Sequence, residues 1–341
     1  MRDFPPIPVQ TRLVFNDSMR ITTTEPKRRF FRFSIRTLLI VLTIVCVWLS
    51  WRVERARKQR EVLAWIQKMG ATVRNYQVDN TKPFIRLDFF NDVVQVGSLR
   101  TQDASPLAGL TDLRALYFEG STLVREVSSL SILTRLEELS LKGSQVSDLS
   151  PLLGLRLLEV LDVEDTRVSN LTPLAGLKSL EVLDLNGTPV NDLMPLAELT
   201  TLKKLYLQDT AVSDVTSLSG LTRINRLNLH GTQVSDVTPL SSLARLEVLH
   251  LSGAPVSDVS ALSGLMALRY LFLNDTHVRD VTPLAGLASL KVLSLNGTQV
   301  EDVTHLTELT GLRYLYLENV PVSEKAVEKL QAALPLCQIR H

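Results

Sequence analysis

The chain has 341 residues, with 37 lysines and arginines against 36 aspartates and glutamates and a formal net charge of +1 at pH 7. This balance excludes the strong positive field with which a protein attracts nucleic acid or another polyanion. The two cysteines, Cys46 and Cys337, are not expected to pair, because Cys46 lies inside an apolar segment.

The first elements in chain order are a tail and an apolar segment. Residues 1–32 contain four prolines and scattered charges without periodicity, which predicts a flexible basic tail. The run TLLIVLTIVCVWLSW is flanked by Arg36 and Arg52. Together with its aromatic flanks, it predicts a transmembrane helix over residues 33–53.

The alternative for this segment is a cleaved signal peptide. The basic leader is long for one, and no small-x-small cleavage site precedes Arg52. We therefore expect a single-pass anchor in a cell membrane. Residues 22–36 and residues 52–66 each carry five basic side chains, so the positive-inside rule does not orient the chain. We expect the repeats to lie outside the cytoplasm, although the charges do not decide this.

The segment after the membrane continues without proline or glycine as far as Gly70, and its apolar residues fall at helical spacing. This predicts a juxtamembrane helix over residues 54–70, whose basic side chains lie at lipid headgroups or on a solvated face. The stretches ATVRNYQV and FIRLDFF have the composition of strands. Residues 71–93 are therefore predicted to cap the open end of the following array.

A 22-residue repeat dominates the rest of the chain. One valine recurs every 22 residues in nine copies: Val146, Val168, Val190, Val212, Val234, Val256, Val278, Val300 and Val322. A leucine pair, L-x-L, keeps this period, and we place its outermost copies at Val94/Val96, Leu116/Phe118 and Cys337/Ile339. The pattern predicts stacked repeats over residues 94–322 and a C-terminal cap helix and strand over residues 323–341.

Each recurring letter has a physical reason. Both leucines of L-x-L face the core from a short strand, and the residue between them faces out. Two residues later only glycine, aspartate or asparagine occurs, which predicts a positive φ, for example at Gly187. The threonine that follows, such as Thr188, is expected to bond the backbone of the neighbouring coil. The segment D-x-[ST]-P-L predicts a capped 3-10 turn.

The repeat L-x-x-L-x-x-L-x-L-x-x-T-x-V-S-D-x-x-P-L resembles the leucine-rich repeat of the 22-residue internalin-like subclass, over about residues 94–341. It differs in carrying threonine where such repeats usually have asparagine. The resemblance implies an α/β-type solenoid, a right-handed coil with a parallel concave β-sheet and 3-10 turns on the convex face, here preceded by one transmembrane helix. The whole arrangement also resembles a family of bacterial single-pass membrane-anchored repeat proteins, which implies a membrane location but no biochemical activity.

The outward residues of the inner sheet are the ones free to bind something. In the later repeats we assign aromatic and cationic side chains to partner binding: Tyr206, Arg226, His230, His250, Tyr270, Phe272, Tyr314 and Tyr316. Aromatics and arginine most often dominate protein–protein binding energy. The alternative is that they pack between neighbouring rows of the sheet. The earlier repeats carry an acidic patch, which we interpret as a solvated face: Glu138, Asp162, Glu164 and Asp184, with Lys142 as its one base.

Catalytic, metal and cofactor sites are not expected. The sequence has no H-E-x-x-H, no G-x-S-x-G and no phosphate-binding glycine loop, and His230 and His250 lack a third metal ligand. The concave face also has too few cations for nucleic acid, and no small-molecule substrate is expected. We predict a membrane-anchored protein that binds another protein on its concave face without catalysis of its own. Two alternatives remain, a structural spacer or envelope component without a discrete ligand, and a regulatory subunit that clasps an enzyme.

Overall fold

A computed structural model describes residues 35–68, 71–75, 93–97, 104–118 and 124–341. The chain divides into two compact units, residues 1–52 and 53–341. Helix α1 (Ile35–Lys68) begins in the first unit, where its large apolar side chains are exposed. By length and composition, this helix could cross a membrane or serve as a signal sequence.

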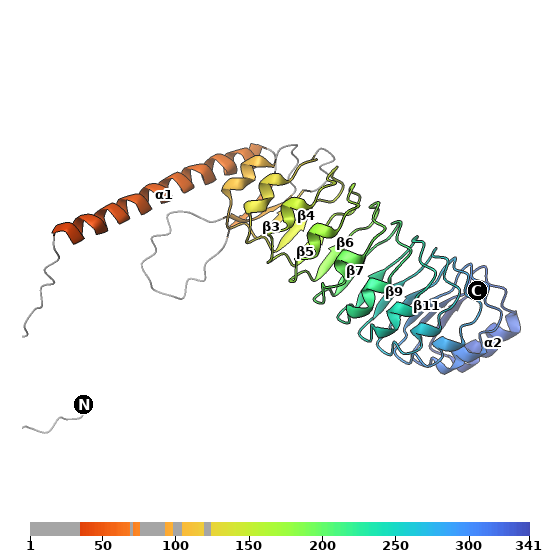
Figure 1. Ribbon diagram of the computed structural model, residues 1–341. Coiled ribbons are helices and arrows are strands. Elements are labelled where there is room, and N and C mark those ends of the chain that lie inside the picture. The colour runs from red at the N-terminus through yellow and green to blue at the C-terminus, as the bar shows by residue number, and fades with distance from the viewer. Residues whose placement is uncertain (1–34, 69–70, 76–92, 98–103, 119–123) are drawn as a thin grey trace, which may run out of the picture. The chain divides into compact units, whose positions relative to one another are not determined.

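The second unit is a solenoid built on one sheet. In the described part of the chain this sheet has 13 strands in sequence order, with β1 antiparallel to β2 and every later pair parallel. The stacked coils and their side-by-side strands are visible in Figure 1. The strands are β1 (Thr72–Asn75), β2 (Val93–Gly97), β3 (Ala115–Tyr117), β4 (Glu138–Ser140), β5 (Val160–Asp162), β6 (Val182–Asp184), β7 (Lys204–Tyr206), β8 (Arg226–Asn228), β9 (Val248–His250), β10 (Tyr270–Phe272), β11 (Val292–Ser294), β12 (Tyr314–Tyr316) and β13 (Gln338–Arg340).

A 3-10 turn follows each strand from β2 to β11 and closes that coil. These turns are η1 (Ser105–Gly109), η2 (Ser128–Ile132), η3 (Ser150–Leu152), η4 (Thr172–Leu174), η5 (Met194–Leu196), η6 (Thr216–Gly220), η7 (Thr238–Ser242), η8 (Ser260–Leu262), η9 (Thr282–Leu284) and η10 (Thr304–Glu308). Asp148 Oδ1 accepts the N–H of Ser150 at 2.8 Å, and the equivalent aspartates of later coils do the same. The aspartate lies one residue before the N-cap position, where Leu149 makes no side-chain hydrogen bond in η3, and it satisfies the first N–H of the turn.

The leucines of the repeat form one continuous core between the sheet and the 3-10 turns. Leu205, Leu227 and Leu249, which pair in successive strands, are at most 1 % exposed. Because no coil can bury these side chains by itself, each coil gains its stability from its neighbours. The predicted solenoid with a parallel concave sheet is confirmed.

The turn after each strand also agrees with the sequence. Gly187 has φ +65°, and Asp165, Asp209, Asp275 and Asn319 have φ values between 54° and 58°. The prediction for the threonines was wrong in one respect. The hydroxyl of Thr166 donates to the carbonyl of Val163 in its own coil at 2.7 Å rather than to a neighbouring coil. The tight turn presents that carbonyl to the hydroxyl three residues later.

The register is shifted at both ends of the array. Val96 pairs with Leu116, so Val96 and not Val94 takes the first leucine position. Ile339 pairs with Leu315, so the position assigned to Cys337 belongs to Ile339. Helix α2 (Glu324–Ala333) replaces the short 3-10 turn of the last coil, and this longer connection moves the strand by two residues. The predicted strand FIRLDFF lies outside the described residues.

Both ends of the core are covered by helical residues. On the N-terminal side, Ala56, Val62 and Ile66 of α1 are buried, and Leu63 and Trp65 pack against the same core. On the C-terminal side Leu330 of α2 is 1 % exposed, and Ser323 caps this helix by accepting the N–H of Ala326. The α1 residues after Val53 thus close the solenoid together with β1.

Candidate functional site

The concave face presents the residues that the strands direct away from the core. At the start of each strand two successive N–H groups converge on one carbonyl: those of Arg269 and Tyr270 lie 2.9 and 3.0 Å from the oxygen of Glu247. This arrangement resembles a β-bulge and leaves two consecutive side chains outside the core. Each repeat therefore displays a residue before the strand, the first strand residue, the third strand residue and the residue two positions further on.

The later repeats carry aromatic side chains on this face. Tyr270 is 38 % exposed and Tyr314 is 41 % exposed, and both are first strand residues. Phe272, a third strand residue of β10, stacks on His250 of the preceding strand β9 with ring centroids 4.1 Å apart and planes 18° apart. Arg340 lies over the ring of Tyr316 at 5.5 Å. The face therefore offers aromatic rings for apolar contact, and a cationic side chain lies over one of them, Tyr316.

The eight predicted partner-binding residues all lie on this face, but they differ in exposure. Arg226, Tyr270 and Tyr314 are exposed, whereas the others are half-buried: Tyr206, His230, His250, Phe272 and Tyr316. The half-buried residues, apart from His230, are third strand residues, which lie deeper between the neighbouring rows. Burial lowers the pKa of His250, and the nearby His230 lowers it further. His250 is therefore neutral at pH 7 and suited to stacking on Phe272.

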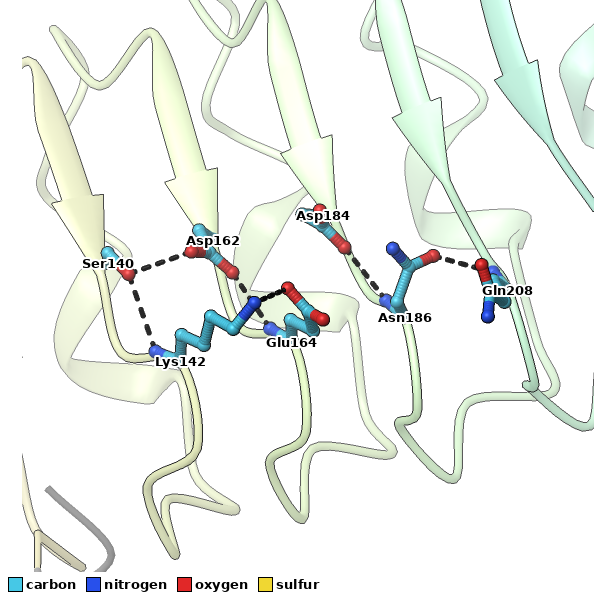
Figure 2. A network of polar contacts seen from close by, with 7 residues as sticks. All are labelled: Ser140, Lys142, Asp162, Glu164, Asp184, Asn186 and Gln208. Atoms are coloured by element: carbon cyan, nitrogen blue, oxygen red, sulfur yellow. Dashed lines mark hydrogen bonds and ion pairs between the residues drawn. The ribbon is translucent and has the colours of Figure 1, made fainter. Parts of the chain in front are cut away.

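The earlier repeats gather carboxylates, as Figure 2 shows. The carboxylate of Asp162 accepts a hydrogen bond from the hydroxyl of Ser140 at 2.8 Å and another from the N–H of Glu164 at 3.0 Å. The ammonium group of Lys142 forms an ion pair with Glu164. Asp184 accepts the N–H of Asn186 at 3.0 Å. Each carboxylate in this acidic network is thus fixed by a partner of its own.

Asp184 carries the clearest electrostatic signal on this face. Burial raises its pKa to about 6, and the charges of Asp162 and Glu164 raise it as well, against the hydrogen bond from Asn186. The carboxylate oxygens of these three residues can lie within 4.8 Å of one another. From the sequence we expected these residues to form a solvated face, and their coupling was not predicted. The 22-residue spacing of Asp162 and Asp184 was the available signal, because residues one period apart are neighbours in a solenoid.

The acidic network offers oxygen ligands of the kind that calcium and magnesium prefer. Asp162, Glu164 and Asp184 supply three carboxylates, whereas calcium takes six to eight oxygen ligands. Lys142 already neutralises part of the negative charge of this network. The three carboxylates alone are fewer oxygen ligands than calcium takes.

Other polar side chains on the face serve the backbone. Asn186 Oδ1 accepts the N–H of Gln208 at 2.7 Å, and Asn296 Oδ1 accepts the N–H of Glu318 at 2.9 Å. Each of these amides satisfies a backbone donor of the next coil, which would otherwise be unpaired. Their role in the solenoid is structural, and it leaves the aromatic and charged residues as the candidates for binding.

No protein-family model matches the sequence, and a search of curated proteins gives no match. Among solved structures, the chain is similar to internalin InlF from Listeria monocytogenes, with 23 % identity and a TM-score of 0.62 over 73 % of this chain and 83 % of that one. It is also similar to the leucine-rich-repeat ectodomain of the plant membrane receptor kinase GASSHO1/SCHENGEN3 from Arabidopsis thaliana, solved in complex with CASPARIAN STRIP INTEGRITY FACTOR 2. There the identity is 19 % and the TM-score 0.57, over 69 % of this chain and 33 % of that one.

A further solved structure is similar in sequence as well as in fold. Internalin C2 from Listeria monocytogenes is 34 % identical, with a TM-score of 0.52, and the match covers 58 % of this chain and 85 % of that chain. The chain belongs to the internalin-like leucine-rich repeat proteins.

Proposed function

We propose that this protein is a membrane-anchored binding protein that holds another protein on the concave face of β7–β12 and performs no catalysis of its own. The observation that carries the proposal is the exposure of Tyr270 and Tyr314 on this face. An aromatic ring exposed to water on a rigid sheet buries a large apolar area when a partner covers it. Tyrosine is also among the residues that most often dominate binding energy.

The rigidity of the sheet supports this role. The main-chain hydrogen bonds of β10 to β9 and β11 fix the backbone of Tyr270 and Phe272 before any partner arrives. A preorganised surface loses less conformational entropy on binding than a flexible loop does. The plant receptor ectodomain with the same fold was solved with a bound factor, which is consistent with a binding role for such a solenoid.

The apolar part of α1 supports the membrane anchor. Its exposed side chains from Ile35 to Val53 would be costly in water, and a bilayer would cover them. We place the repeats outside the cytoplasm, where a concave binding face meets partners of other cells or of the envelope. The basic residues on the two sides of this segment do not decide that orientation.

The test is photo-cross-linking in intact membranes. A photo-reactive amino acid replaces Tyr270 on the concave face, and the matched control replaces Ser241, which is exposed on the 3-10 turn η7. Proteins captured from position 270 and not from position 241 are the expected result. Capture of the same proteins from both positions, or of none, would contradict the proposal and favour a structural spacer.

A further inference from the structure

Three cations stand in consecutive coils beside the exposed tyrosines. Arg269, Lys291 and Arg313 each precede a strand of β10–β12, and we call them the cationic column. The N–H of Lys291 donates to the carbonyl of Arg269 at 2.8 Å, and the N–H of Arg313 donates to that of Lys291 at 2.8 Å. Their backbones are therefore direct neighbours at the strand spacing of about 4.8 Å.

The same position in earlier coils is occupied differently. Glu137 forms an ion pair with Arg114 at 2.8 Å, and Glu181 forms one with Lys203 at 2.7 Å. In those pairs opposite charges meet across adjacent coils, which is the favourable arrangement. Glu137, Glu159 and Glu181 also stand in consecutive coils, but Arg114 and Lys203 pair with the outer two. The cationic column likewise places three like charges side by side, which is destabilising across strands.

Within the described part of the chain, no carboxylate neutralises the cationic column by an ion pair. Arg269 and Arg313 are exposed, and the Lys291 ammonium donates to the carbonyl of Gly311 at 3.2 Å. Glu247, which precedes Arg269 at this position, is the nearest acid along the row, but the two side chains form no ion pair in the structure described here. The column is therefore a surface that would gain free energy from an added anion.

The chemistry around the column limits the class of partner. Tyr270 and Tyr314, the residues after its two arginines, are exposed and offer apolar contact beside the charges. The column is only three cations long, and the carboxylates of Glu247 and Glu318 on the same face would repel a long polyanion. A short acidic segment of a protein fits better than nucleic acid does.

The dimensions agree with an extended segment. Three neighbouring coils span about 10 Å between the outer two backbones, at about 4.8 Å for each strand. An extended chain places side chains of one face about 6.8 Å apart. Two carboxylates two residues apart can therefore both meet the column, while residues beside them contact Tyr270 and Tyr314.

We propose that the cationic column of Arg269, Lys291 and Arg313 binds an extended acidic segment of the partner protein and seats it beside Tyr270 and Tyr314. This inference rests on the proposed function, because it assigns the chemistry of the partner for the same face. It also supplies counterions to three like charges that form no ion pair among the described residues, whereas the outer acids of the earlier row, Glu137 and Glu181, pair with Arg114 and Lys203.

The test uses the full chain in detergent micelles and a short fluorescent peptide in which glutamate alternates with valine. The control peptide carries glutamine in place of each glutamate, and fluorescence anisotropy reports binding. The variant Arg269→Gln/Arg313→Gln removes the two exposed charges of the column. The matched control Arg223→Gln/Arg245→Gln removes two exposed arginines from neighbouring coils outside the column.

We expect the acidic peptide to bind wild type and the control variant alike, and to bind the column variant about tenfold more weakly. Added salt should weaken the interaction with wild type. Equal binding of the two peptides, no binding of the acidic one, or an equal loss in the control variant would overturn the proposal. So would tighter binding of a short duplex DNA, which would indicate a site for polyanions.

Two further measurements distinguish this proposal from a packing role of the three cations and from the proposed function of the concave face. Removing like charges should leave the unfolding temperature of the column variant unchanged or raised, and a lower temperature would show that the cations serve packing instead. Cross-linking from position 270 tests the proposed function independently. If the column variant captures the same partner as wild type, the concave-face function stands and the acidic-segment proposal fails. If nothing is captured while the acidic peptide binds through the column, the proposed function fails and the column stands.

Discussion

At the scale of single residues, the turn after each strand shows how one position limits the choice of amino acid. Gly143 and Gly187 occupy equivalent turns with φ +70° and +65°. A Cβ at Gly143 would meet nothing within 4 Å, whereas one at Gly187 would collide with Oδ1 of Asp165 in the preceding coil. The backbone cost of alanine is therefore common to both positions, and the collision is particular to Gly187.

We expect Gly143→Ala to lower the free energy of unfolding by about 1–2 kcal/mol, the cost of placing an L-residue in the left-handed region. Gly187→Ala should cost more, and the additional replacement Asp165→Gly should remove the excess. Urea denaturation of the full chain in micelles measures these differences. An equal loss at both glycines would show that the Asp165 side chain moves aside without cost.

The ionisation of Asp184 predicts a pH dependence. Its pKa of about 6, against 3.8 for the ordinary group, means that the folded state binds this proton more tightly than the unfolded state does. The resulting stability is fully present below about pH 3.8 and is lost as the pH rises through about 6. Above that range, the ionised carboxylate is half-buried beside Asp162 and Glu164.

Asp184→Asn removes this charge and keeps an oxygen that can accept the N–H of Asn186. We expect the variant to be more stable than wild type by about 1 kcal/mol near neutral pH, after allowance for solvent screening. The difference should disappear below about pH 4, where wild type is protonated. Asp148→Asn is the control, because hydrogen bonding to Ser150 lowers the pKa of Asp148 and its replacement should not stabilise. A constant Asp184→Asn effect at all pH values would contradict the assignment.

At the scale of elements, the final turns of α1 act as a cap. Ile66 is fully buried, Val62 approaches Gly109 so closely that an added Cβ would lie 3.3 Å from its Cγ2, and Arg55 forms an ion pair with Asp112. These contacts cover the N-terminal end of the described core. The apolar positions that the sequence places at helical spacing thus serve the solenoid.

Ile66→Ala should destabilise the first coils by about 2–5 kcal/mol, because it leaves a cavity at the end of the core. Coils of a solenoid interact mainly with their neighbours, so the loss should stay local. Hydrogen exchange should show faster exchange in residues 104–118 and little change in β10–β12. Leu330→Ala, at the opposite end, is the matched control and should affect β12 and β13 instead. Uniform loss along the chain would show that the array unfolds as one unit.

At the scale of the whole molecule, the two cysteines report on the membrane. Cys46 is exposed on the apolar part of α1, and Cys337 is buried in the solenoid. If the apolar segment lies in a bilayer, neither thiol can meet a reagent confined to water. The pair therefore distinguishes an anchored chain from a water-exposed one.

We expect neither cysteine of the full chain to react with a membrane-impermeant maleimide in intact membranes. Solubilisation in detergent with a permeant reagent should label Cys46, and Cys337 should need denaturant because burial raises the pKa of its thiol and shields it. The variant Cys337→Ala isolates the signal of Cys46. Labelling of Cys46 in sealed membranes from either side would place the segment outside the bilayer core.

The sequence by itself determined the solenoid, the strand positions, the positive-φ turns and the leucine core. Each of these follows from the geometry of one coil and is repeated every 22 residues, so an error in one copy is corrected by the others. The outward orientation of the eight partner-binding candidates was predicted for the same reason, because alternation along a strand decides which side chains face out.

Only the tertiary structure decided the features that depend on several coils at once or on the ends of the array. Val96 and Ile339 take the first leucine positions because the terminal coils differ in length from the repeat. Tyr270 is exposed and Tyr206 half-buried because neighbouring rows cover the third strand residue more than the first. The coupling of Asp184 to Asp162 and the unpaired charges of the cationic column arise between side chains 22 residues apart. Their distances and burial are set by the stacking of coils, which no single repeat contains.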